Sequence, residues 1–303
     1  MVHIFIVNPY AGQKTFADDL RSKLEGIKGL NYFVFNTRYA GYEREVVKKI
    51  QHIFEDEKLR FYCCGGSGTM RNMLNGFDDL ANVEIAFFPC GLTNDFLKMF
   101  GEDEARFHQI EELIKGDVIS VDYIRTNYGV SLNTLSCGFD SAFADKLERY
   151  RLLSAFGAQV PYVSALLYAL FVSKSQEYEI YLDDKKLEGT YAEVFFGNGS
   201  MFGGNMRFAP ETCINDGKGI YFIAPPMKGV GALPIVTALI AGKEEKLNKR
   251  VYRGEGQRIK IRRTDGSPFA MNFDGELEEV HKEWEAEIIR KGLHLVVPKG
   301  VKL

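Results

Sequence analysis

Apolar positions in residues 1–125 alternate between short continuous runs and a helical spacing of three to four residues. Ile4–Val7 is a run of the length of a buried strand, whereas Val46, Val47, Ile50 and Phe54 recur on one face of a helix. Strands are predicted at residues 4–7, 32–35, 61–64, 84–88 and 118–124, and helices at residues 16–27, 46–54, 68–75 and from Asn94 onward. This succession predicts a doubly wound, mainly parallel α/β sheet, whose ligands bind at the carboxyl ends of its strands.

After about residue 125 the predicted segments become short and mostly β. Strands are predicted at residues 178–182, 191–197, 220–223, 258–261, 269–273 and 293–297, and helices at residues 142–150, 160–172 and 233–241. We therefore predict an antiparallel, β-sandwich-like second domain, with domains at residues 1–125 and 126–303 and the last ~10 residues able to return to the first. The cleft between two such domains is the expected place for the active site.

Composition excludes several classes of protein. The 38 basic and 41 acidic residues give a net charge of −3, so no overall cationic field favours nucleic acid, and a local basic face is left open. The five cysteines lack metal-binding spacing, which favours free thiols in a reducing cytoplasm over zinc. The apolar stretch 152–172 is interrupted by Gly157, Gln159 and Pro161 and is shorter than the ~20 residues of a spanning helix, so we interpret it as a core helix.

Residues 61–69 (FYCCGGSGT) combine an apolar run, three glycines and the start of a helical pattern. Glycine lets backbone N–H groups approach an oxyanion, and a helix N-terminus adds partial positive charge. The stretch is thus a candidate phosphate-binding turn, with a plain connection as the alternative.

Several stretches together resemble motifs of the diacylglycerol kinase catalytic family, the lipid kinases that include sphingosine and ceramide kinases. Residues 8–12 (NPYAG) resemble its N-P-x-[SA]-G, residues 65–69 its G-G-D-G-T, and residues 89–96 (PCGLTNDF) its P-x-G-T-x-N-D-F. Residues 203–210 (GGNMRFAP) and 215–217 (NDG) resemble G-G-x-x-x-x-A-P and D-D-G, and residues 274–276 match D-G-E. The matches follow the family's order across nearly the whole chain, so it resembles a bacterial member.

The resemblance implies an ATP-dependent lipid kinase with a nucleotide-binding first domain and a lipid-binding second domain. The implied nucleotide-binding residues are Asn8, Thr37, Gly65, Gly66, Ser67, Gly68, Thr69, Thr93 and Asn94. Glu276 is implied as the general base, with Asp274 beside it. If the two acids lay on an extended strand they would share a face, and one would raise the proton affinity of the other. A solvated hairpin turn is the alternative for this stretch.

The resemblance also implies a structural Mg²⁺. Asp216 would bind it with the backbone carbonyls of Cys213 and Lys218, and Asp95 and Asp122 would extend a water-bridged carboxylate network. An Asx-turn for Asp216 and a helix cap for Asp95 are the structural alternatives.

Three departures from the family pattern fall around this expected site. Ser67 replaces an aspartate, Leu92 replaces a threonine that appears one place later as Thr93, and Asn72 stands where a glutamate is usual. A serine brings no negative charge to a metal, so catalysis would weaken more than nucleotide binding. We favour kinase activity. The alternative is an inactive relative that binds a nucleotide or a lipid. A third hypothesis is a kinase of a soluble substrate, similar to the NAD kinases, but the second-domain motifs count against it.

The implied acceptor is a lipid alcohol such as diacylglycerol. Val163, Leu166, Leu167, Leu170 and Phe171 are candidates for an acyl-chain pocket, with core packing as the alternative. Lys14, Lys98 and Lys174 are candidates for contact with anionic headgroups at a membrane surface. We expect a cytoplasmic protein that associates peripherally with the membrane during catalysis, and leave a homodimer open.

Overall fold

The computed structural model describes residues 1–11, 16–91, 94–157, 160–203, 206–208, 212–227, 229–247 and 250–302. The chain forms two compact units. Unit 1 holds Met1–Tyr123, Ile214–Asp216 and Ile289–Leu303, and unit 2 holds Ile124–Cys213 and Gly217–Ile288.

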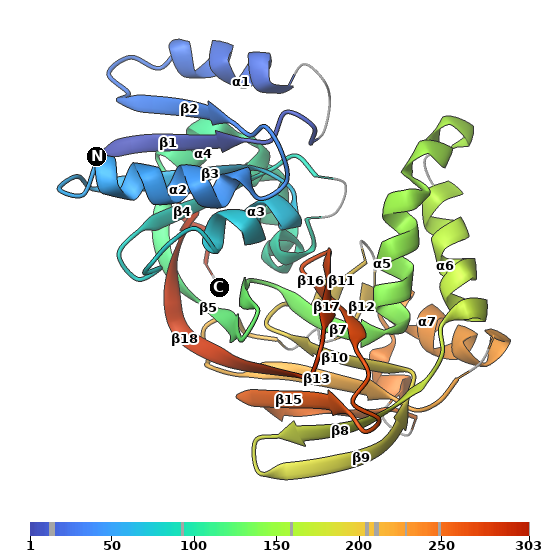
Figure 1. Ribbon diagram of the computed structural model, residues 1–303. Helices are drawn as coiled ribbons and strands as arrows, with labels where there is room; N and C mark the ends of the chain where they lie inside the picture. The colour runs from blue at the N-terminus through green and yellow to red at the C-terminus, as the bar shows by residue number, and fades with distance from the viewer. Residues whose placement is uncertain are drawn as a thin grey trace. The chain divides into compact units, whose positions relative to one another are not determined.

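Unit 1 is built on a parallel sheet in the order β2-β1-β3-β4, to which the end of β18 is added in parallel. Its strands are β1 (Val2–Val7), β2 (Tyr32–Asn36), β3 (Leu59–Gly65), β4 (Glu84–Pro89) and part of β5 (Asp117–Thr126). Its α-helices are α1 (Phe16–Glu25), α2 (Tyr42–Ile53), α3 (Ser67–Leu74) and α4 (Ile110–Ile114). Every residue of β1, β3 and β4 is buried, because helices cover both faces: α2 and α3 lie in front of the strands and α4 behind them (Figure 1). The predicted doubly wound α/β domain is confirmed.

The helix predicted from Asn94 is different in the structure. Residues Asp95–His108 form the 3₁₀ segment η1, which breaks at Gly101 with φ 56° and ψ −122°. The apolar positions Phe96, Leu97 and Phe100 are buried as a helical pattern requires, but the glycine ends the first piece after two turns.

Unit 2 contains a sandwich of two antiparallel sheets. One has β15 (Arg258–Arg263) between β8 (Gln176–Leu182) and the first half of β18 (Glu283–Val297), with β9 (Lys185–Tyr191) at its edge; β6 (Gly129–Ser131) pairs with β5. The other runs β14 (Tyr252–Gly256), β13 (Gly219–Ala224), β10 (Glu193–Gly197), β7 (Thr134–Gly138), β16 (Phe269–Phe273) and β17 (Glu276–Val280). Ile180, Ile261 and Trp284 of the first sheet pack with Val194 and Phe196 of the second in a closed apolar core. The predicted β-sandwich-like domain is confirmed.

A second apolar core lies on the other face of the six-stranded sheet, where three helices pack. They are α5 (Phe139–Arg149), α6 (Val160–Val172) and α7 (Leu233–Ile240), and they lie along one side of the sheet in Figure 1. Phe195 of β10 contributes to this core while Val194 and Phe196 contribute to the first, so β10 is buried on both faces. The 3₁₀ turns η2 (Arg151–Phe156), η3 (Gly229–Ala232) and η4 (Glu244–Leu247) and the short hairpin β11 (Met201–Phe202) and β12 (Met206–Arg207) complete the unit.

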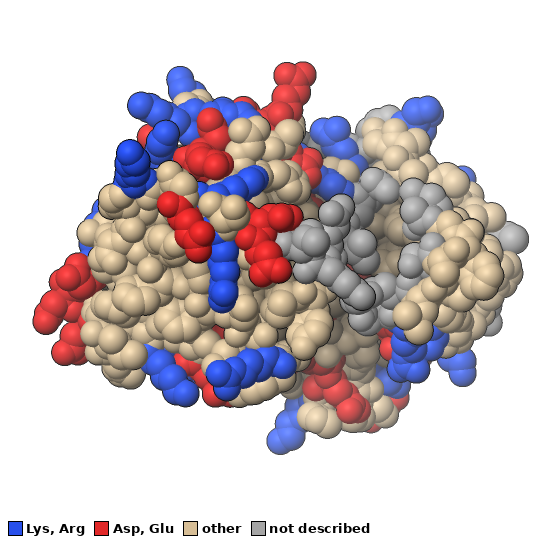
Figure 2. Space-filling view, turned by 90° about the horizontal axis from the view of Figure 1, so that it is seen from above, with Lys and Arg blue, Asp and Glu red and all other residues tan. Residues whose placement is uncertain are grey.

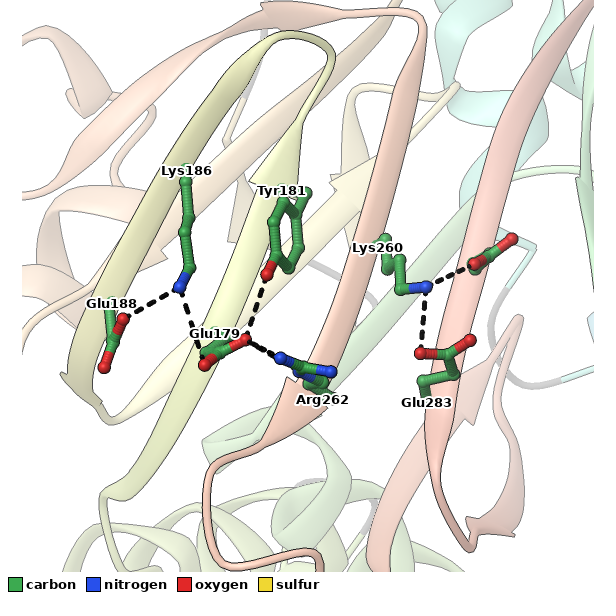
Figure 3. Close-up of polar contacts among 8 residues, drawn as sticks. Glu179, Tyr181, Lys186, Glu188, Lys260, Arg262 and Glu283 are labelled. Atoms are coloured by element: carbon green, nitrogen blue, oxygen red, sulfur yellow. Dashed lines mark hydrogen bonds and ion pairs between the residues drawn. The ribbon is translucent and has the colours of Figure 1, made fainter.

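The outer face of the first sheet is polar and held by ion pairs (Figure 3). Glu179 is bound by Arg262 at 2.5 Å and by Lys186 at 3.5 Å, and Lys260 contacts both Glu283 and Glu285. A groove of about 760 Å³ crosses this face between Arg125, Tyr181 and Arg258. Arg125 and Arg258 both pair with Glu287, so the basic side chains of the groove are matched by acidic ones.

In the described part of the chain, no helix has the length and hydropathy needed to cross a membrane. The interpretation of the 13-residue helix α6 as a core helix holds for one face only, because Ala169 and Leu170 are buried whereas Leu167 and Phe171 are exposed.

Candidate functional site

The glycine-rich stretch forms the junction between β3 and α3 in unit 1. Gly65 ends β3, Gly66 is the N-cap of α3 in an extended conformation, and Ser67 is the first helical residue. No side-chain hydrogen bond from the described residues caps this helix, and the Met70 N–H donates to the Gly66 carbonyl at 3.0 Å as the first bond of α3. The junction therefore has the geometry that binds oxyanions at a helix N-terminus.

The glycines are also required by packing between two neighbouring loops. The Cys90 N–H donates to the Gly65 carbonyl at 2.8 Å, and a Cβ on Gly91 would lie 2.6 Å from the Gly66 Cα. A Cβ on Gly65 would lie 2.6 Å from the Thr69 side chain. Larger residues would thus force the ends of β3 and β4 apart, so the loop can keep this shape only with glycine at these positions.

Three more predicted nucleotide-binding residues lie at the carboxyl ends of these strands. Asn8 follows β1, and its Nδ2 donates to the Thr69 hydroxyl at 3.0 Å. Thr37 follows β2 and is buried, with its N–H on the Val7 carbonyl. Asn94 donates from Nδ2 to the Gly91 carbonyl at 3.1 Å, while its Oδ1 is buried without a partner in the described part of the chain. The structure therefore gathers Asn8, Thr69 and Asn94 around the loop.

Some predicted residues lie outside the described residues. They are Gly12 of the N-P-x-[SA]-G stretch, Leu92 and Thr93 of the P-x-G-T-x-N-D-F stretch, Lys14, and residues 204–205 and 209–210 of the second-domain motif. Their roles stay predictions.

Two of the departures from the family pattern have described surroundings. Ser67 is half-buried in the first turn of α3 and presents a hydroxyl where the family has a carboxylate. The buried Asn72 accepts a hydrogen bond from Arg44 Nε at 3.1 Å, so it ties α3 to α2. Neither substitution leaves a carboxylate at these positions.

Asp274 and Gly275 form the two-residue turn of the β16–β17 hairpin in unit 2, with Phe273 paired to Glu276. Both have positive φ, 53° and 97°, as in a type I′ turn. The expectation that Asp274 and Glu276 lie on one extended strand and share a face is therefore wrong, because left-handed turn residues do not follow strand alternation. The hairpin alternative holds, yet the turn is not solvated at Asp274.

The Asp274 carboxylate is 6% exposed and accepts three backbone N–H groups. Its Oδ2 accepts from Leu132 at 2.7 Å, and its Oδ1 accepts from Asn133 at 3.0 Å and Thr134 at 2.7 Å. Such bonds stabilise an ionised carboxylate. Asp274 thus fixes the turn to the start of β7, while Glu276, the next residue but one, is half-exposed.

The acidic residues predicted around a metal each contact different partners in the structure. The Asp122 N–H donates to the Ile214 carbonyl at 2.6 Å, which places the turn before the exposed Asp216 against β5. Asp122 Oδ1 accepts the Lys291 N–H at 2.6 Å, and Asp95 Oδ1 contacts Lys98 Nζ at 3.0 Å. Within the described ranges, no three His, Cys, Asp or Glu side chains form a group that could hold a metal ion. The oxygen donors of the Asp216 turn suit Mg²⁺ chemically, as one carboxylate supplemented by carbonyls and water.

The thiols beside the glycine loop are not nucleophiles. Burial raises the pKa of Cys90 to about 12 and raises the pKa values of Cys63 and Cys64 well above their ordinary value. They remain protonated at neutral pH and act as small apolar side chains. Among the described residues on the face that Figure 2 shows, acidic and basic side chains are interspersed.

Comparison with known proteins decides the family. Residues 3–126 match the model of the diacylglycerol kinase catalytic domain, and residues 133–296 match that of the YegS C-terminal NAD kinase beta sandwich-like domain. The chain belongs to the diacylglycerol kinase catalytic family. The resemblance of its motifs is thereby confirmed, and membership of this lipid kinase family supports kinase activity with ATP as phosphoryl donor.

Individual relatives agree with the family. "Probable lipid kinase YegS-like" of Alcanivorax borkumensis is 25% identical over 79% of this chain and 79% of its own length. YtlR of Bacillus subtilis, which also carries a lipid-kinase name, is 26% identical over 68% of this chain and 72% of its own. A crystal structure titled as a diacylglycerol kinase from Bacillus anthracis superposes with a TM-score of 0.67 at 18% identity, covering 99% of this chain and 98% of that one, which supports the fold.

Proposed function

We propose that this protein is an ATP-dependent lipid kinase that phosphorylates the hydroxyl of a lipid alcohol such as diacylglycerol, with Glu276 as general base. The observation that carries the proposal is the Asp274-Gly275 turn, whose buried carboxylate holds three backbone N–H groups and fixes the position from which Glu276 projects. A solvent-exposed hairpin would not need such an anchor.

Phosphoryl transfer asks the protein mainly to hold the phosphates and to neutralise their charge. The uncapped N-terminus of α3 supplies N–H donors and partial positive charge, and Asn8, Thr69 and Asn94 surround it with polar groups. Thr37 and Thr93 complete the proposed nucleotide site. Asn94 Oδ1, buried without a described partner, is available to a donor on the nucleotide.

Proton transfer is the second requirement. Glu276 is half-exposed, so a lipid hydroxyl can reach its carboxylate, while the neighbouring Asp274 is already occupied by backbone donors. We therefore assign the base to Glu276 and a structural role in the turn to Asp274.

Magnesium would supply electrostatic stabilisation of the transferring phosphoryl group and of the nucleotide phosphates. Asp216, with the carbonyls of Cys213 and Lys218, is the proposed protein site. Asp95 accepts from Lys98 and Asp122 accepts from the Lys291 N–H, and we propose that these two carboxylates contact the metal through water.

The acceptor side of the proposal rests on α6 and η2. Phe171 is 67% exposed and Leu167 50% exposed, and Leu152 and Phe156 in η2 exceed 80%. Leu170, by contrast, is buried in the core beneath the helices, so the predicted acyl-chain candidates divide into core and surface residues. We propose that these exposed apolar side chains contact lipid and that the protein associates peripherally with the membrane surface.

Ser67 supports a second candidate function, a nucleotide- or lipid-binding protein without turnover. The loop keeps its donor N–H groups but lacks the carboxylate that the family places there.

The test is transfer of labelled phosphate from ATP, with magnesium, to a panel of lipid alcohols in mixed micelles. Wild type, Glu276→Ala and Ser67→Asp are compared. Transfer by the wild type that Glu276→Ala abolishes supports the kinase, and the preferred lipid identifies the acceptor. Transfer that appears with Ser67→Asp alone supports the binding protein instead.

A further inference from the structure

A buried polar cluster lies behind the Asp274-Gly275 turn. The Gly275 N–H donates to Asn272 Oδ1 at 2.7 Å, and Asn272 Nδ2 donates to Asp140 Oδ2 at 2.7 Å. The Ser136 hydroxyl donates to the same Asp140 oxygen at 2.5 Å. All three side chains are at most 8% exposed, so solvent does not compete for these bonds.

The Asp140 carboxylate determines the orientation of the Asn272 amide. An ionised carboxylate only accepts hydrogen bonds, so it binds the NH₂ end of the amide and leaves the carbonyl end toward Gly275. With the amide reversed, its NH₂ group would face the Gly275 N–H and two donors would oppose each other. Asp140 therefore selects the one orientation that satisfies the turn.

Local backbone geometry places Asp140 at this point. Gly138 ends β7 with φ 113°, and a Cβ there would lie 2.2 Å from the Ala192 carbonyl oxygen. The chain then enters α5, where the Phe139 N–H donates to the Ala192 carbonyl at 3.0 Å and the Asp140 N–H to Glu193 Oε2 at 2.8 Å. The first turn of α5 is thus fastened to the start of β10.

Glu193 is the second acidic side chain of this cluster. Burial and the neighbouring Asp140 carboxylate raise the pKa of Glu193 well above its ordinary value. The Asp140 carboxylate accepts hydrogen bonds from both Ser136 and Asn272, and such donors favour the ionised form of a carboxylate.

We propose that Asp140 and Asn272 are positioning residues for catalysis: Asp140 orients the Asn272 amide, Asn272 holds the Gly275 backbone, and the turn thereby aims Glu276 at the acceptor hydroxyl. The inference rests on the proposed role of Glu276 as base. Neither residue needs to touch substrate, so their loss is expected to lower kcat while substrate binding is retained.

Two single variants break this chain of hydrogen bonds without changing side-chain shape. Asp140→Asn permits the Asn272 amide to reverse, and Asn272→Asp sets two carboxylates against each other. For each folded variant we expect kcat to fall about 10- to 100-fold, with the KM for lipid and the Kd for ATP changed less than about 3-fold. A folded Asp140→Asn protein with the wild-type kcat would overturn the inference.

The swapped double variant, Asp140→Asn with Asn272→Asp, restores one amide and one carboxylate across the contact. The carboxylate introduced at position 272 would accept from both the new amide and Gly275, so kcat is expected to return to within about 3-fold of wild type. A folded double variant whose loss equals the product of the two single losses would contradict the coupling. If a single variant does not fold, recovery of both folding and turnover in the double variant gives the same support, and a folded double variant without turnover overturns the inference.

Glu276→Ala, assayed alongside, separates the two proposals. Turnover that persists in Glu276→Ala refutes the base itself. Loss of turnover in Glu276→Ala, combined with the wild-type kcat in Asp140→Asn, refutes the positioning role and leaves the base assignment standing. If turnover requires Ser67→Asp, the same variants are compared in that background.

Discussion

His3 is a buried titratable group whose charge state affects the stability of unit 1. It is 8% exposed, its Nδ1 lies 2.8 Å from the Tyr62 hydroxyl, and burial together with the Arg60 charge lowers its pKa to about 4. Unfolded histidine takes up a proton near its ordinary pKa, whereas folded His3 resists until about pH 4. The free energy of unfolding therefore does not depend on this group above pH 6.5. It falls by up to about 3 kcal/mol as the pH falls from 6.5 to 4, because the unfolded state takes up the proton first.

Urea unfolding of wild type and His3→Gln at pH 7.5 and pH 5 tests this assignment. The glutamine keeps a polar partner for Tyr62 but does not titrate in this range, so its unfolding free energy should fall less between the two pH values. Equal pH dependence in the two proteins would refute the role of His3.

Gly91 is a residue where sequence alone supplied a motif and the structure supplies the reason. A Cβ at Gly91 would lie 2.6 Å from the Gly66 Cα and 3.3 Å from Asn94 Oδ1. We expect Gly91→Ala to cost about 1–3 kcal/mol in unfolding free energy and to weaken ATP binding, because the glycine loop must shift. Calorimetric titration with ATP and denaturant unfolding measure both effects.

Gly231→Ala is the matched control, since no atom lies within 4 Å of a Cβ built there and its φ is not left-handed. That variant should stay within about 0.5 kcal/mol of wild type and bind ATP normally. An equally mild effect at Gly91 would show that the loop tolerates a side chain.

At the scale of elements, the continuous apolar strands of unit 1 were predictable, whereas two charge-rich edge strands of unit 2 were not. The strands at residues 61–64 and 84–88 followed from continuous apolar runs, because both faces of the parallel sheet are covered. The strands Lys185–Tyr191 and Glu276–Val280 were missed because their sequences, KKLEGTY and ELEEV, are rich in charge and lie at sheet edges. The run 191–197 was predicted as one strand but divides at Ala192, between β9 and β10.

Strand β18 shows why long elements are hard to delimit from sequence. It runs from Glu283 to Val297, but its apolar end alone, residues 293–297, was predicted. The polar residues Arg290 and Lys291 interrupt the pattern, and Lys291 has φ 51°. Pairing with β15 and β4 holds the strand together where local preference does not.

The exposed face of α6 makes a prediction at this scale. Leu167 and Phe171 are four residues apart on the exposed face, whereas Leu170 is 5% exposed. Replacing both Leu167 and Phe171 by alanine should weaken binding to lipid vesicles about 10-fold or more and raise the KM for lipid, with little change in stability. Vesicle co-sedimentation and denaturant unfolding provide the measurements.

Leu170→Ala serves as the control on the buried side of the same helix. It should cost about 2 kcal/mol or more in stability, and the folded protein should bind vesicles as the wild type does. Unchanged vesicle binding by the Leu167 and Phe171 double variant would exclude this face as the lipid contact.

For the whole molecule, ordered motifs predicted the family and the two domain types, and the comparisons confirm both. Sequence reasoning did not find Asp140 or Asn272, because isolated polar residues in apolar strands and helix starts carry no local signal. Their importance comes from tertiary contacts that join β7, β16 and α5. Asp274 was found, but its burial and its three backbone partners could not be inferred from D-G-E alone.

The central claim is that Glu276 is the base of an ATP-dependent lipid kinase, and the most direct test is kcat for Glu276→Gln together with its Kd for ATP. Glu279→Gln is the matched control, because Glu279 is exposed on the same strand β17. We predict a 10²- to 10⁴-fold loss of kcat, roughly, for Glu276→Gln with an unchanged Kd, and wild-type values for Glu279→Gln. Wild-type turnover by Glu276→Gln would contradict the account.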